Sequence, residues 1–253
     1  MPDIHGVGGE KGGVGKSTVC KRILEYLVEN QISFFAFDTD RSAPDLKKAY
    51  KKLDIDIREA YFSEAVDKQD AASVIVDVAD EATVLLNLSA ASFDAVSTWI
   101  KENEVLEVIS GANEFYLWFV TDGGVESASS LYRSLTTYGK QIHHILVKNE
   151  GVNRSKDWRL IDSDQRLQTL IKQCGVKELV FPEFYGVETS RIIRDNSLGF
   201  AEALEKAGDL GFGKIDKQRI KRFLRESGEA IESVGIFKRR QIAEVGQGGK
   251  GKG

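Results

Sequence analysis

The segment IHGVGGEKGGVGKST, residues 4–18, decides the fold of this 253-residue chain. It begins with a short apolar run, continues through a glycine-rich stretch, and leads into a helical pattern that starts near Lys16. The glycines let the backbone turn sharply and approach a ligand, and the free N–H groups of the following helix favour a polyphosphate. The segment therefore predicts a phosphate-binding loop with the candidate residues Lys11, Gly12, Gly13, Val14, Gly15, Lys16, Ser17 and Thr18.

Strand and helix patterns alternate along the chain. An apolar fraction of 42% supports a buried core. Predicted strands lie at 4–7, 32–37, 73–78, 115–121, 142–147 and 178–181, and helical patterns at 16–30, 93–100, 125–135, 158–174 and 216–231. Nearly continuous apolar strands are typical of a parallel sheet that is buried on both faces. We therefore expect one α/β domain, a doubly wound and mostly parallel sheet with helices on both faces.

The chain becomes basic from Lys214 onwards. This part contains eleven Lys and Arg residues and five Asp and Glu residues, so its net charge is +6. The whole chain has a net charge of −4, so residues 1–213 carry −10. Glycine and lysine dominate the last eight residues, a composition typical of a flexible tail. We predict a main domain over 1–213, a basic helical extension packed on it over 214–245, and a disordered tail over 246–253.

Composition excludes several classes of function. The net charge of −4 provides no global attraction to nucleic acid or anionic lipid, so such contacts need a local patch. Cys20 and Cys174 are far apart and match neither a disulfide framework nor a metal site, so buried thiols are expected. The absence of a signal-peptide pattern and of a long apolar run predicts a cytoplasmic protein.

Acidic residues follow the predicted strands. Asp38 and Asp40 follow one strand, and Asp77 closes another. Ligands of an open parallel sheet bind beyond the carboxyl ends of its strands, so we expect these acids near the phosphates. Because Mg²⁺ takes few protein ligands, Ser17, Asp38 and Asp77 form the predicted magnesium site. Two further acids are interpreted as solvated loop residues, Asp80 and Asp122.

The glycine-rich loop resembles the deviant Walker A motif of the ParA/MinD group of P-loop ATPases. The residues KGGVGKS at 11–17 fit that motif, including its additional lysine at Lys11, whereas the ordinary motif requires a glycine where this chain has Glu10. Other segments resemble motifs of the same group in order along the chain: switch I at 38–40, the Walker B strand at 74–77, and adenine-contacting segments at 147–149 and 181–183.

The resemblance implies an ATPase with a P-loop NTPase fold that binds ATP and Mg²⁺ and closes into a homodimer across the nucleotides. It implies that Lys11 contacts the phosphates in the opposite subunit, that Lys16 contacts those in its own, and that Asp40 orients or deprotonates the attacking water. By the same resemblance the adenine site comprises Asn149, Pro182 and Glu183. The chain departs from the group after two acids, with Arg41-Ser42 and Val78-Ala79 where proline is common.

Three classes of cellular function are compatible with such an ATPase. The first is a ParA-like protein that segregates or positions DNA in plasmid partition or mobilisation, on the nucleoid and with a small stimulating adaptor. Lys217, Lys221 and Arg225 share one face of the predicted helix 216–231 and would contact phosphates. The second is a MinD-like membrane-cycling protein that uses a weak apolar stripe in 234–245. The third is a metabolic or metal-delivery enzyme on the same fold, for which the cysteine spacing is unsuitable.

Overall fold

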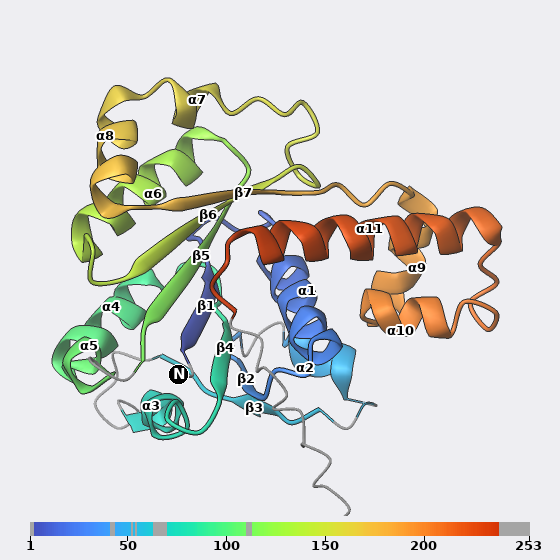
Figure 1. The fold of residues 1–253 in the computed structure, drawn as a ribbon, viewed down its shortest axis with the longest axis horizontal. Helices are drawn as coiled ribbons and strands as arrows, with labels where there is room; N and C mark the ends of the chain where they lie inside the picture. The colour runs from blue at the N-terminus through green and yellow to red at the C-terminus, as the bar shows by residue number, and fades with distance from the viewer. Residues whose placement is uncertain are drawn as a thin grey trace, which may run out of the picture.

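The core of the molecule is a sheet whose described strands have the order β3-β2-β4-β1-β5-β6-β7 (Figure 1). The computed structural model describes residues 3–40, 44–51, 53, 55–62, 70–109 and 113–237. All neighbouring pairs among the described strands are parallel. The strands are β1 (Ile4–Gly8), β2 (Phe34–Asp38), β3 (Ile57–Glu59), β4 (Thr83–Asn87), β5 (Phe115–Thr121), β6 (His143–Asn149) and β7 (Lys177–Phe181).

Helices cover both faces of the sheet and form two apolar clusters with it. One face carries α1 (Lys16–Glu29), α2 (Asp45–Tyr50), α9 (Val187–Asp195), α10 (Phe200–Glu205) and α11 (Lys214–Ser233). The other carries α3 (Ser73–Asp77), α4 (Phe93–Glu102), α5 (Val105–Ile109), α6 (Val125–Tyr138), α7 (Arg159–Asp162) and α8 (Gln165–Cys174). The predicted doubly wound α/β fold is confirmed. The strand order reverses at β1, so the loop after β1 lies at the topological switch point, where ligands of such sheets bind.

The prediction of a strand at 73–78 is wrong, because this run forms α3. The strand that enters the sheet is β4, which begins at Thr83. Adjacent parallel strands require a crossover of about a dozen residues or more, and the chain between Asp77 and Thr83 is much shorter. The apolar run instead packs Ile75 into the core within the crossover that precedes β4. Periodicity does not distinguish a short buried helix from a strand.

The helix predicted over 158–174 is divided into α7 and α8. Asp164 separates the two, because its side chain accepts hydrogen bonds from the N–H groups of Arg166 (2.9 Å) and Leu167 (3.1 Å). Such a cap satisfies backbone donors that a helix start leaves unpaired. The side chain of Asp164 therefore starts a new helix where the apolar spacing alone suggests continuity.

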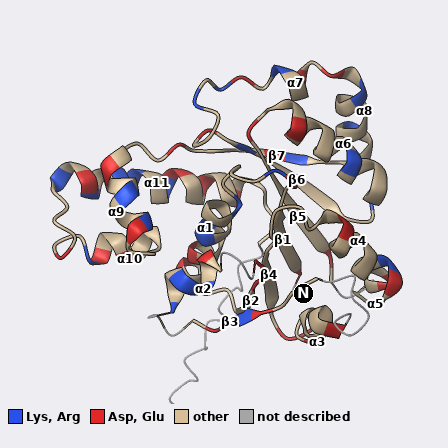
Figure 2. Ribbon diagram, turned by 180° about the vertical axis from the view of Figure 1, so that it is seen from behind, with Lys and Arg blue, Asp and Glu red and all other residues tan. Residues whose placement is uncertain are grey.

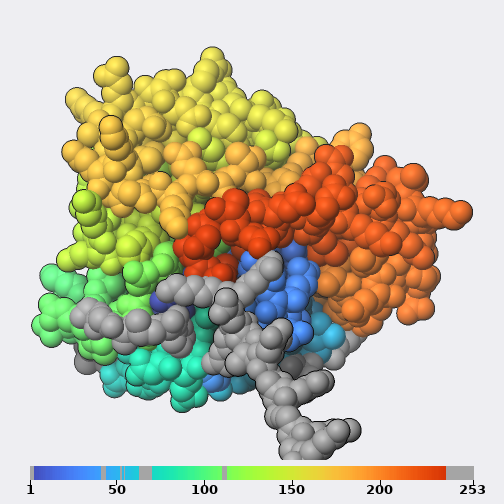
Figure 3. Space-filling model, viewed as in Figure 1, coloured from blue at the N-terminus to red at the C-terminus, as the bar shows by residue number. Residues whose placement is uncertain are grey.

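The basic helix α11 lies on the surface across α1 and beside α10 (Figure 3). Its interior face contributes Phe223 and other apolar side chains to the core. Arg22 of α1 is fully buried, pairs with Glu25 at 2.7 Å, and donates to Ser227 Oγ at 2.9 Å and to the Leu224 carbonyl at 3.2 Å. The extension therefore shares the core of the main domain as far as residue 237.

The last part of the predicted extension, 238–245, and the predicted disordered tail, 246–253, lie outside the described residues. Among the helices that the structure describes, none combines the length and the apolar character needed to cross a bilayer.

Two histidines are buried and neutral within the core. His5 stacks on Tyr116 with ring centroids 5.0 Å apart, and burial lowers its pKa to about 3. Burial also lowers the pKa of His144 to about 4. Both folded-state pKa values lie below the ordinary value of 6.5. Between these values the unfolded chain binds more protons than the folded one, so stability rises with pH in this window.

We expect the free energy of unfolding to fall on acidification from about pH 7.5 to about pH 5, by about 2 kcal/mol for each of these two histidines. Chemical denaturation at several pH values would measure this loss. His5→Phe, which retains an aromatic ring, should remove about half of the dependence. His143→Phe serves as the control, because the side chain of His143 is 50% exposed. Equal pH dependence in His5→Phe and in the unaltered protein would contradict the assignment.

Candidate functional site

The predicted phosphate-binding loop connects β1 to α1 at the carboxyl edge of the sheet. Gly12 and Gly13 are exposed, and a Cβ built on either would meet no heavy atom within 4 Å. Gly15 has a φ of 92°, and a Cβ there would collide with the side-chain nitrogen of Asn149. The loop is therefore open to a ligand at its tip and depends on glycine at its junction with α1.

Lys16 is the first residue of α1, and its side chain reaches back to the loop. Its side chain is 8% exposed, and its Nζ donates to the Lys11 carbonyl at 2.8 Å. Burial lowers the pKa of Lys16, and the negative charge of Asp40 opposes this shift. The charge of Asp40 therefore favours the protonated form of Lys16.

Lys11 forms an ion pair with Asp122, which follows β5. Lys11 Nζ lies 2.5 Å from Asp122 Oδ2, while Ser127 Oγ (2.7 Å) and the Gly124 N–H (3.0 Å) donate to Asp122 Oδ1. Partial burial disfavours ionisation of Asp122, but these hydrogen bonds outweigh it and hold its pKa below the ordinary value. The interpretation of Asp122 as a solvated loop acid is wrong, because its carboxylate forms an ion pair with Lys11.

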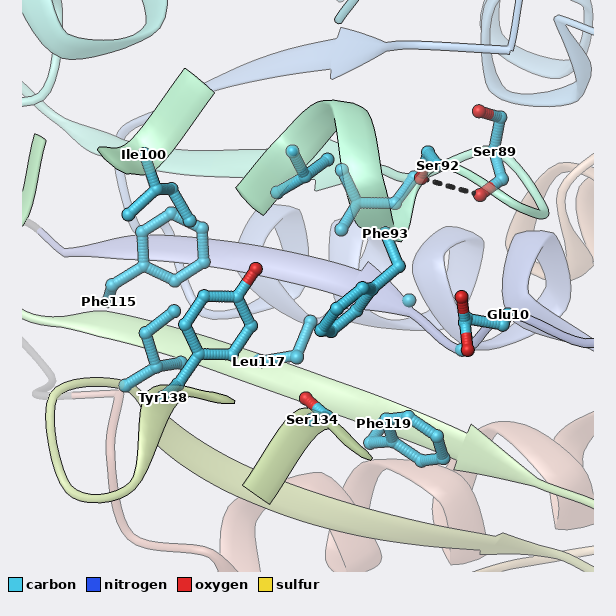
Figure 4. A pocket seen from close by; sticks show the side chains of 15 residues that line it. Glu10, Ser89, Ser92, Phe93, Ile100, Phe115, Leu117, Phe119, Ser134 and Tyr138 are labelled. Carbon is cyan, nitrogen blue, oxygen red and sulfur yellow. Dashed lines mark hydrogen bonds between the residues drawn. The ribbon is translucent and has the colours of Figure 1, made fainter. Parts of the chain in front are cut away.

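Glu10 points away from the loop tip towards α6, where it pairs with Arg133 at 3.1 Å. It lies at one end of a small apolar cavity of about 40 Å³ between the sheet and helices α4 and α6 (Figure 4). Phe93, Leu117 and Tyr138 line this cavity. Glu10, the residue that departs from the ordinary Walker A motif, thus contacts α6 and not the glycines at the tip of the loop.

Asp38 is the carboxylate at the end of β2, and it is 2% exposed. Its Oδ2 accepts hydrogen bonds from the N–H groups of Leu46 (2.9 Å) and Lys47 (3.1 Å), which fixes the start of α2. Burial raises the pKa of Asp38, and these hydrogen bonds oppose the increase. Burial raises the pKa of Cys20, one helical turn beyond Ser17 on α1, and the negative charge of Asp38 adds to this shift.

Asp77 does not belong to this site, so its assignment as a magnesium ligand is wrong. It is an exposed residue at the end of α3, which precedes β4 at the amino edge of the sheet (Figure 1). The strand beside β1 is β4, and the residue at its carboxyl end is Asn87. Asn87 Nδ2 donates to Asp38 Oδ1 at 3.0 Å.

Asn87 also carries an unpaired buried oxygen. The residue is 2% exposed, and among the described residues its Oδ1 has no hydrogen-bond partner. A buried polar atom without a partner is rare, and side-chain oxygens suit Mg²⁺. The side-chain oxygens of Asp38 and Asn87 therefore fit a divalent cation, and Ser17 of the adjoining loop remains its third predicted ligand. No group of three or more His, Cys, Asp or Glu residues in the described ranges forms a separate metal site.

A cavity of about 310 Å³ adjoins the loop at the end of β6. Gly15, Thr18, Asn149 and Pro182 line it together, although they are far apart in the sequence. Asn149 Nδ2 donates to the Val14 carbonyl at 2.8 Å, which joins the cavity to the loop. The other predicted adenine-site residue lies beside it and forms an ion pair at 3.0 Å, Glu183 with Arg154.

The structure thus unites most of the predicted site. It brings the loop residues, Asp38, Asp40, Asn149 and Pro182 to one edge of the sheet, and it leaves Asp77 outside. Sequence reasoning missed Asn87 and the role of Asp122. An apolar run over residues 84–86 that ends in a polar residue was the available signal for Asn87. The pairing of Lys11 with Asp122 has no local signal, because the two residues are 111 positions apart.

The chain resembles proteins of known sequence or structure, although no protein-family model matches it. It is 26% identical over 186 residues to the protein MobD of Acidithiobacillus ferrooxidans, covering 71% of this chain and 77% of MobD. MinD in the MinC:MinD cell division complex of Aquifex aeolicus superposes with a TM-score of 0.50 and 14% identity, covering 88% of this chain and 94% of that chain. An ADP-bound nucleotide-binding protein from Archaeoglobus fulgidus gives a TM-score of 0.49 and 11% identity, over 78% of this chain and 87% of that one. Together with the strand order and the loop after β1, the superposition on MinD shows that this chain has the P-loop fold of the MinD/ParA-like ATPases.

Proposed function

We propose that the protein is a Mg²⁺-dependent ATPase that dimerises on ATP and uses hydrolysis to segregate or position DNA. The observation that carries the proposal is the loop itself, in which the buried Lys16 ammonium donates to the Lys11 carbonyl, and Asn149, which lines the adjoining cavity, donates to the Val14 carbonyl. The triphosphate would lie against the loop, with the base in the 310 Å³ cavity.

The residues divide the work of phosphoryl transfer among them. Lys16 stabilises charge on the phosphates, and Asp40 orients or deprotonates the attacking water. Magnesium supplies charge neutralisation at the phosphates when bound, and Ser17, Asp38 and Asn87 would hold it. Positioning and electrostatics provide most of the catalysis in such reactions, so a loop that holds the Lys16 ammonium in place meets the requirement.

Two protein partners follow from this proposal. A second copy of the chain would close over the nucleotide, with Lys11 contacting the opposite phosphates. MinD is found with MinC in the Aquifex aeolicus complex, which supports a separate adaptor protein as the second partner. The adaptor would stimulate hydrolysis and so release the dimer.

The proposed DNA surface is the exposed face of α11, a helix with both basic and acidic residues along its length (Figure 2). Lys217, Lys221 and Arg225 are exposed there, one helical turn apart. Arg225 lies 3.7 Å from Glu226 and 3.9 Å from Glu229, whereas neither lysine has an ion pair within the described residues. The two lysines are therefore available for DNA phosphates. Attachment to the nucleoid would place the protein in the cytoplasm.

We expect the purified protein to retard non-specific duplex DNA only with ATP. Lys217→Ala/Lys221→Ala should weaken binding and reduce the slope of log affinity against log salt by about 2, because each phosphate contact releases condensed counterions. Gel retardation over a range of salt concentrations would measure both effects. Lys101→Ala/Lys172→Ala is the matched control, because these exposed lysines lie on α4 and α8, on the opposite face. An unchanged salt slope in the α11 variant would contradict the surface.

The MinD-like alternative is tested by sedimentation with anionic liposomes. Of the predicted apolar stripe, Val234 is 5% exposed, and Phe237 packs on His5 with ring centroids 4.6 Å apart. These side chains contribute to the protein core, and Ile242 and Val245 lie outside the described residues. Truncation after Phe237 retains the core residues. Liposome binding that this truncation abolishes, together with no ATP-dependent DNA retardation, would replace the DNA proposal with the membrane one.

A further inference from the structure

β4 pairs with β1 and ends in an amide, Asn87, whereas the Walker B strand that the ParA/MinD resemblance placed at 74–77 ends in an acid. Asn87 lies between two strands, opposite Val7 of β1 and Asp38 of β2. The main-chain carbonyl of Asn87 accepts from the Thr39 N–H (3.1 Å) and from Thr39 Oγ1 (2.9 Å). The backbone around Asn87 is therefore held on both sides, and its side chain is presented in a fixed position.

The orientation of the Asn87 amide follows from its neighbour. Nδ2 lies 3.0 Å from Asp38 Oδ1, so it donates to the carboxylate. The opposite orientation would bring two acceptor oxygens together, which is unfavourable in a buried site. The amide oxygen therefore faces away from Asp38. It lies at the carboxyl edge of the sheet, where β1 leads into the loop with Lys16 and Ser17, and it has no partner among the described residues.

We propose that Asn87 supplies this neutral oxygen to the divalent cation that accompanies the nucleotide, so that the cation binds with the nucleotide and not before it. The inference rests on the proposed function. The strand ends of β2 and β4 contribute one carboxylate, Asp38, and one amide. Two of the hydrogen bonds that Asp38 accepts already come from the start of α2. The remaining negative charge for the cation must come from the phosphates.

The number of charged ligands strongly affects divalent-cation affinity. In Asn87→Asp, a second carboxylate would lie beside Asp38 in place of the 3.0 Å hydrogen bond. Two close carboxylates repel each other unless a cation or a proton lies between them. Asn87→Asp should therefore create cation binding that needs no nucleotide. Asn87→Ala should do the reverse, because it removes the oxygen and leaves the loop lysines in place.

The test uses the full chain and two readouts that do not depend on turnover. Free Mn²⁺ is measured by electron paramagnetic resonance without nucleotide, and ADP affinity is measured by calorimetry with and without Mg²⁺. Asn87→Asp should bind Mn²⁺ at least about tenfold more tightly than the unaltered protein. In Asn87→Ala the Mg²⁺-dependent gain in ADP affinity should fall about tenfold, while ADP affinity without Mg²⁺ is unchanged.

Asn113→Ala is the matched control. Asn113 is also a buried asparagine that donates to an acid, with Nδ2 3.2 Å from Asp80 Oδ1, but it precedes β5 at the amino edge of the sheet. It should retain the full Mg²⁺ effect. A full Mg²⁺ effect in Asn87→Ala, or unchanged Mn²⁺ affinity in Asn87→Asp, would overturn the role of Asn87. Failure of the unaltered protein to bind ADP at all would instead overturn the proposed function, and the role of Asn87 with it.

Discussion

Replacing Lys16 with alanine is expected to lower ATP affinity by about 100-fold or more, because it removes the cation that the loop encloses. The lysine is 8% exposed and its ammonium group is held in place by the Lys11 carbonyl at 2.8 Å. Little ordering is then required when phosphate arrives, so most of the interaction contributes to binding. Calorimetry with ATP and Mg²⁺ would measure the loss.

Asp40→Ala separates binding from chemistry at the same site. This variant should bind ATP with nearly unchanged affinity and should hydrolyse it about 100-fold more slowly, because a general base contributes about that much. Lys172→Ala on the exposed side of α8 controls for the loss of a lysine. ATP affinity that stays within about threefold in Lys16→Ala would exclude a phosphate-binding role for the loop. Normal turnover in Asp40→Ala would remove Asp40 from the mechanism.

Replacing Lys11 with alanine is expected to abolish ATP-dependent dimerisation while leaving nucleotide affinity nearly unchanged. In the separate subunit the Lys11 ammonium is bound by Asp122, away from Lys16 Nζ, which contacts the Lys11 carbonyl. A lysine that neutralises phosphate across a water-excluded interface contributes several kcal/mol, so the dimer should weaken by about 100-fold or more. Sedimentation velocity with ATP would measure the dimer, in an Asp40→Ala background to prevent turnover.

Asp122→Asn provides the opposite test. If Lys11 must leave Asp122 to reach the second subunit, loss of this partly exposed ion pair should strengthen the dimer, by up to about fivefold. Ser127 and the Gly124 N–H, which donate to Asp122 Oδ1, remain in place to support an asparagine oxygen there. Dimerisation that is unaffected in Lys11→Ala would exclude a contact between this lysine and the opposite nucleotide.

The sequence predicted the elements whose signals are local. The loop after β1 needs only glycines and a lysine at a helix start, and the predicted strand 115–121 coincides with β5. It did not predict the break at Asp164, where a side-chain cap competes with helical spacing. It also placed a strand on α3, because a short run of four small or apolar residues, 73–76, is compatible with a helix or a strand.

By itself, the sequence determined the class of fold and the phosphate-binding loop, because residues 4–18 carry their own conformational requirements. Only the tertiary structure decided which side chains complete the site. Parallel strands bring distant residues to one edge of the sheet, so Asn87 lies beside Asp38 and Asp122 beside Lys11, while Asp77 lies at the opposite edge. The order of the strands in the sheet decides which of these residues lie side by side. That order depends on the length of the crossover connections and on the burial of both faces of the sheet.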